Sequence, residues 1–156
     1  MSFLGGTNLI DPSPGTAFRM VNKKAVDVLL VLLILLDVVY DIVIFGSPAT
    51  WFHVIHGTPL DDPEGLLRRT AAGWASFALW QIVALIRWKQ HRHWLMLVAG
   101  IRWTEIFADW TYVYFAQHLT LVGHIGLLSA GPVNFLCGWF FYRSYFKAAP
   151  SDAGHA

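Results

Sequence analysis

Four long apolar runs, separated by shorter polar segments, dominate the pattern of this chain. They cover residues 25–45, 70–86, 94–115 and 121–141. Each is close to the roughly 20 residues that an α-helix needs to cross the hydrocarbon of a bilayer. The link between the third and fourth runs is very short, so those two helices should be antiparallel neighbours. The pattern predicts an all-α integral membrane protein with four transmembrane helices in an antiparallel up-and-down bundle.

The segments outside the apolar runs are rich in turn residues. Residues 1–24 contain Gly-Gly, Asp-Pro and Ser-Pro-Gly sequences, which predict an irregular cytoplasmic lead before a transmembrane domain at residues 25–147. Residues 148–156 are expected to form a flexible tail. Between the first two runs, the apolar pairs in residues 51–55 indicate a short amphipathic piece at the membrane interface, where aromatic rings are favoured.

Composition agrees with a membrane protein. Of 156 residues, 56% are hydrophobic and 13% are charged, whereas soluble domains average about 25% charged residues. The net charge of +1 argues against a nucleic-acid partner, which calls for a basic face. The one cysteine, Cys137, permits no intrachain disulfide and no multi-cysteine metal site.

The distribution of basic residues predicts an orientation. With four spans, both termini share one side of the membrane together with eight basic residues, against two on the opposite side. The eight are Arg19, Lys23, Lys24, Arg87, Lys89, Arg92, Arg143 and Lys147, and the two are Arg68 and Arg69. By the positive-inside rule, we expect a multi-pass protein with both termini in the cytoplasm.

The third run carries the most informative polar residues. Arg102, Glu105, Asp109 and Tyr112 are spaced three, four and three apart, so they share one face of an α-helix. Ionisable groups at membrane depth are costly and usually face a bundle interior or a wet cavity, where they have a function. This stripe therefore predicts a functional site.

The first run adds Asp37 and Asp41, one helical turn apart, which makes Glu105, Asp109, Asp37 and Asp41 the candidate catalytic residues. Four carboxylates in low dielectric need protons, cations or pairing, and Arg102 can neutralise only one of them. An Arg102–Glu105 pair across one turn is expected. The structural alternative, helix-to-helix hydrogen bonding by these acids, yields on average only about 0.6 kcal/mol per contact, so we favour a functional role.

Further candidates concern binding. Arg102, Tyr112, Tyr40, Trp103, Trp110 and Asn134 are the candidate substrate-binding residues, although the deep tryptophans could instead pack between helices. His53, His56 and His124 are weak candidates for metal ligands, because interfacial histidines more often have structural roles. We predict neither a metal nor another cofactor.

These observations favour a protein that binds a hydrophobic small molecule such as an isoprenoid, sterol-like or quinone-like compound, with conversion of that molecule by acid–base chemistry as an extension of the same hypothesis. An activity of this kind would be of the isomerase or cyclase type, with one acid as general acid and another as general base. A proton- or cation-coupled transporter and a non-catalytic subunit of a larger membrane complex are the alternatives. Membrane lipids and the small molecule are the expected partners, with a homo-oligomer or larger complex as a further possibility.

Overall fold

The computed structural model describes residues 22–60 and 65–147 and is entirely helical over these ranges. Its five helices are α1 (Lys23–Gly46), α2 (Pro48–His56), α3 (Leu66–Arg87), α4 (His93–Phe115) and α5 (Leu121–Lys147). The four predicted runs correspond to α1, α3, α4 and α5, with ends that extend by up to six residues. The predicted tail and nearly all of the predicted lead lie outside the described residues.

Local sequence explains where the first two helices begin and end. The Asn22 side chain accepts a hydrogen bond from the backbone N–H of Ala25 over 3.2 Å and so caps the start of α1. Ser47 separates α1 from α2, and Pro48 occupies the first turn of α2, where a missing N–H costs nothing. Gly57 adopts a positive φ of 72° directly after α2, the left-handed conformation that commonly ends a helix.

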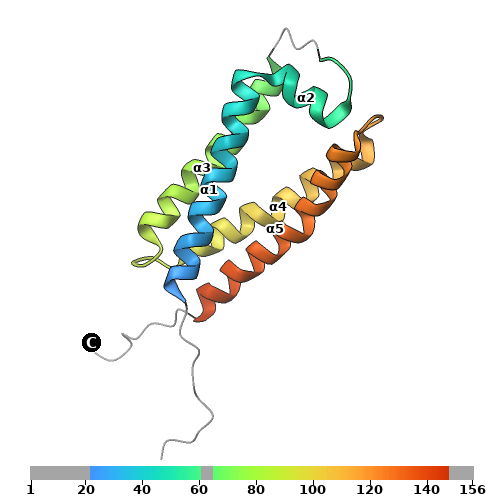
Figure 1. The fold of residues 1–156 in the computed structure, drawn as a ribbon. Helices are drawn as coiled ribbons and strands as arrows, with labels where there is room; N and C mark the ends of the chain where they lie inside the picture. Colours follow the sequence, from blue (N-terminus) through green and yellow to red (C-terminus); the bar gives the residue numbers. More distant parts are fainter. Residues whose placement is uncertain (1–21, 61–64, 148–156) are drawn as a thin grey trace, which may run out of the picture.

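The long helices are arranged as two pairs (Figure 1). α1 packs along α3, and α4 packs along α5. The pairs meet where α1 begins and α5 ends, and they diverge towards α2, which lies across the wide end. The sequence predicts an antiparallel up-and-down bundle, and the four long helices are antiparallel, but they are arranged as a V of two pairs.

The narrow end of the V holds the hydrophobic core. Nine buried side chains from α1, α4, α5 and the end of α3 with its C-cap Trp88 pack together there: Val26, Leu30, Leu33, Ala84, Trp88, Leu95, Val98, Ala99 and Phe141. Close packing of this kind fixes the angle at which the two pairs meet. At the edge of this core, the Trp88 indole N–H and the Lys89 ammonium both donate to the Asp27 carboxylate, over 2.8 and 2.7 Å.

At the wide end, α2 is fastened to the link between α4 and α5. The backbone N–H of Thr120 donates to the carbonyl of Ile55 over 2.8 Å. The Thr120 hydroxyl donates to the carbonyl of Val54 over 2.7 Å. Gly123 lies so close to the Ile55 carbonyl that a Cβ would overlap it. These contacts tie the α1–α3 side of the molecule to the α4–α5 side.

Two of the helices, α1 and α5, are long and apolar enough to cross a membrane by length and composition. Four such helices were expected. α4 is not among the two because it carries three charged side chains, Arg102, Glu105 and Asp109. Nevertheless, large apolar side chains are exposed on all four long helices, among them Ile42 (66%), Ile86 (67%), Phe107 (75%) and Leu121 (75%).

Candidate functional site

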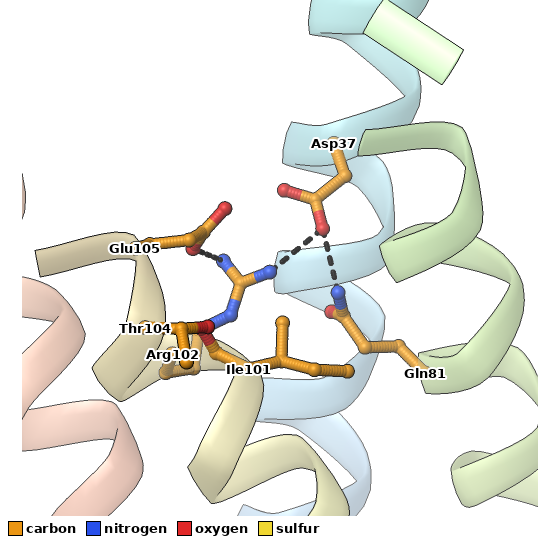
Figure 2. Close-up of polar contacts among 6 residues, drawn as sticks. All are labelled: Asp37, Gln81, Ile101, Arg102, Thr104 and Glu105. Atoms are coloured by element: carbon orange, nitrogen blue, oxygen red, sulfur yellow. Dashed lines mark hydrogen bonds and ion pairs between the residues drawn. The ribbon is translucent and has the colours of Figure 1, made fainter. Parts of the chain in front are cut away.

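A buried ionic network lies just above the core, where the two helix pairs separate (Figure 2). One terminal nitrogen of Arg102 on α4 donates to the Asp37 carboxylate on α1 over 2.9 Å. The other is 2.9 Å from a carboxylate oxygen of Glu105, one turn further along α4. The Gln81 amide on α3 donates to the same Asp37 oxygen over 2.6 Å. The network thus joins three helices and both pairs.

Burial makes this network costly to build and costly to break. Arg102 and Asp37 are only 1% and 2% exposed. Taking these charges out of water is repaid only when geometry and additional hydrogen bonds are good. The planar guanidinium suits the task, because its nitrogens can face two carboxylates at once. Within the described chain, Nε of Arg102 and Oε1 of Gln81 remain buried without a hydrogen-bond partner.

Above the network, between the two pairs and beneath α2, is a cavity of about 500 Å³. This volume is in the range of small-molecule sites, which hold roughly 300–1,000 Å³. All five helices contribute to its lining. The charged part of the wall is formed by Asp37, Arg102, Glu105 and Asp109, and the α5 part by the small and aliphatic residues Gly126, Leu127, Ser129, Ala130 and Val133 together with Asn134.

Another part of the wall is aromatic. Tyr40 of α1 contacts Trp51 of α2 and Trp74 of α3, with ring centroids 5.1 and 6.3 Å away. All three line the cavity. Phe52 stacks on His56 with centroids 4.1 Å apart, and both also line the cavity. The site therefore places carboxylates and aromatic rings around one space.

His56 connects α2 to α4 across the top of the cavity. Its Nδ1 is 2.6 Å from the backbone carbonyl of His118, and its Nε2 is hydrogen-bonded to the Tyr112 hydroxyl. A carbonyl can only accept, so Nδ1 carries a hydrogen. A neutral His56 is consequently in the tautomer whose Nε2 accepts from Tyr112. This bond has no signal in the sequence, because the two residues belong to helices far apart in the chain.

Most of the predicted site residues come together at this cavity. Those that line it are Asp37, Tyr40, Arg102, Glu105, Asp109, Tyr112 and Asn134. The predicted Arg102–Glu105 pair forms. Arg102 also pairs with Asp37, a contact between two helices that helical spacing within one run could not reveal.

Three predicted residues do not line the cavity. Asp41 is outside its lining, although one of its carboxylate oxygens is buried without a hydrogen-bond partner in the described part of the chain. Trp103 and Trp110 face α5 instead, where their indoles occupy the space left by Gly138 and Gly131. Both tryptophans therefore contact α5, although Trp110 remains 51% exposed.

The weak metal candidates are also separated. Of the three histidines, only His56 lines the cavity, whereas His53 and His124 do not. Over residues 22–60 and 65–147, no three histidine, cysteine, aspartate or glutamate side chains come close enough to hold a metal ion.

Two residues of the site, Gln81 and Trp51, have only weak signals in the sequence. Gln81 is fully buried and bound to Asp37, and its only signal was a polar amide within an apolar run. Trp51 was assigned to the membrane interface, yet it lines the cavity because α2 folds back over the wide end. Comparison of the chain with known protein families, with characterised proteins and with solved structures gives no significant match.

Proposed function

We propose that this protein spans a membrane with its four long helices and binds a hydrophobic small molecule in the cavity between the two helix pairs. The observation that carries this proposal is the cavity itself, which combines about 500 Å³ of space with a charged wall and an aromatic wall. Concave, mostly apolar sites with a few convergent polar groups are typical of small-molecule binding.

Exposed side chains support the membrane part of the proposal. Each long helix presents large apolar residues outward, a surface that is unfavourable in water and suited to lipid. The three charged residues of α4 are accommodated because Arg102 and Glu105 pair within the network and Asp109 faces the cavity. On this arrangement the narrow end of the V, with its many basic residues, would lie on the cytoplasmic side.

The polar groups define the part of the ligand that would be recognised. A molecule with an isoprenoid, sterol-like or quinone-like body would place its apolar part against the rings of Tyr40, Trp51 and Trp74. Its polar end would reach Asp109 and Glu105. If the protein is an enzyme, these two carboxylates are the pair from which a general acid and a general base would be drawn.

Binding is favoured over transport by the packing of the narrow end. A route across the membrane would have to pass through the core around Leu30, Leu95 and Phe141, all of which are fully buried. None of the nine core side chains lines the cavity. A blind cavity is suited to a ligand that enters and leaves on the same side.

The test is native mass spectrometry of the gently purified protein, with a variant that fills the cavity. Gly126 lines the cavity, and a Cβ there would meet no other atom within 4 Å. Gly73 has the same free space but does not line the cavity. We expect a co-purifying lipid-like molecule in the wild type and in Gly73→Phe, and its loss in Gly126→Phe. Absence from the wild type, or equal occupancy in both variants, would refute the proposal.

A further inference from the structure

We infer that the ligand of this cavity is a hydrophobic cation, an ammonium-bearing molecule whose positive charge lies between the Asp109 carboxylate and the aromatic wall. This inference rests on the proposed binding function and narrows it to one chemical class. It draws on the charge balance of the cavity, on the polar side chains left without partners and on the position of the rings.

The charge balance leaves the cavity acidic. Three carboxylates, Asp37, Glu105 and Asp109, share the lining with one guanidinium. Both terminal nitrogens of that guanidinium are already used by the first two acids. Asp109 has no hydrogen-bond or ion-pair partner among the described residues. In a low-dielectric site an ionised carboxylate without a counter-charge is costly, so a cationic occupant would be stabilised there.

A second feature favours an occupant with polar groups. Asn134 on α5 is only 8% exposed and lines the cavity, yet its amide makes no hydrogen bond within the described residues. Buried amides are nearly always hydrogen-bonded in native proteins. The unused amide thus points to a ligand, or to water carried with it, that supplies the missing partner beside the carboxylates.

The aromatic wall supplies the remaining requirement of a cation site. The three rings of Tyr40, Trp51 and Trp74 form a continuous surface, with neighbouring centroids 5.1 and 6.3 Å apart. Aromatic faces attract ammonium groups, most strongly where the pair is removed from water. A neutral ligand would gain from these rings by apolar contact alone and would leave the Asp109 carboxylate without a counter-charge.

The experiment compares two ligands that differ only in charge. One is a phenylalkyl trimethylammonium ion, and the other is its neutral isostere with a quaternary carbon in place of nitrogen. Binding of each is measured by quenching of tryptophan fluorescence, with the protein in nanodiscs of zwitterionic lipid and with empty nanodiscs as the blank. We expect the cation to bind wild-type protein at least tenfold more tightly than the isostere.

Two variants test which carboxylate causes the preference for the cation. Asp109→Asn should remove it, so that cation and isostere bind about equally. Asp27→Asn, which changes a carboxylate paired with Lys89 outside the cavity lining, should leave it intact. Equal binding of the two ligands to the wild type, or a preference that survives in a folded Asp109→Asn protein, overturns this inference while binding itself stands. Failure of both ligands to bind overturns the inference and counts against the proposed function too.

Discussion

Arg102 and Asp37, which are 65 positions apart in the chain, form a buried ion pair that links the two halves of the molecule. The pair is the only charge-to-charge contact between α1 and α4 in the described structure. It lies where the helix pairs part, between the apolar core below and the cavity above. Its loss would therefore affect both the packing of the pairs and the charge of the site.

This pair leads to a prediction on stability. Arg102→Met removes the cation that both Asp37 and Glu105 use, and breaking a buried pair from one side costs about 3–5 kcal/mol. Lys89→Met breaks the Lys89–Asp27 pair, whose side chains are 52% and 30% exposed, and should cost at most about 1 kcal/mol. Thermal or denaturant unfolding in a mild detergent measures both. Similar losses of stability in the two variants would contradict the prediction that a buried pair is more costly to break than an exposed one.

A second prediction concerns the contact of α4 with α5. Gly138→Ala would drive a Cβ into the Trp103 indole, and overpacking of this kind typically costs about 1–3 kcal/mol. Gly100→Ala adds a Cβ that meets no atom within 4 Å, and alanine favours a helix over glycine by about 1 kcal/mol. Unfolding experiments should therefore show opposite signs for these substitutions. A stabilised Gly138→Ala protein would contradict the packing of Trp103 on α5.

The fastening of α2 can be tested by hydrogen exchange. Thr120→Val removes the hydroxyl that donates to Val54, a bond worth about 1 kcal/mol. Amides of α2 should then exchange several-fold faster, as should those of the first turn of α5, because the Gly123 N–H donates to the same hydroxyl over 3.0 Å. Amides in the core at the narrow end should keep their rates. Thr104→Val is the control, since that hydroxyl bonds to the carbonyl of Ile101 in its own helix. Unchanged exchange in α2 after Thr120→Val would mean that other contacts hold this helix in place.

The orientation of the protein can be tested by cysteine labelling. In a Cys137→Ser background, cysteines placed at Asn22 and Gln90, near the narrow end, should react only after the membrane is made permeable. A cysteine at Thr58, just beyond α2, should react from outside the cell. These outcomes follow from the basic residues near the narrow end. Labelling of position 22 in intact cells would reverse the proposed topology.

The sequence was informative about helices and about which face of α4 is polar, because both follow from local periodicity. Apolar runs of the right length define α1, α3, α4 and α5, and the three–four–three spacing brings Arg102, Glu105, Asp109 and Tyr112 to one cavity. Such patterns depend only on the geometry of a single helix.

Contacts between helices were beyond that reasoning. Whether a tryptophan faces a cavity or a neighbouring helix depends on the partner surface, and only the positions of Gly131 and Gly138 opposite α4 decide the matter for Trp110 and Trp103. The separation of Asp41 from Asp37 has a similar origin. A step of four residues along a helix offsets a side chain by about 40°, and Asp41 lies outside the lining.

Because only the narrow end is closely packed, the position of the far helix ends sets the size of the cavity. The core holds the two pairs together at the narrow end, and α1, with 24 residues, extends about 36 Å at 1.5 Å per residue. A rotation of α1 by about 5° about its end in the core would move its far end by roughly 3 Å over that length. The size of the cavity therefore depends on the bonds that Thr120 and His56 make at the wide end, because these bonds hold the far ends of the two pairs together.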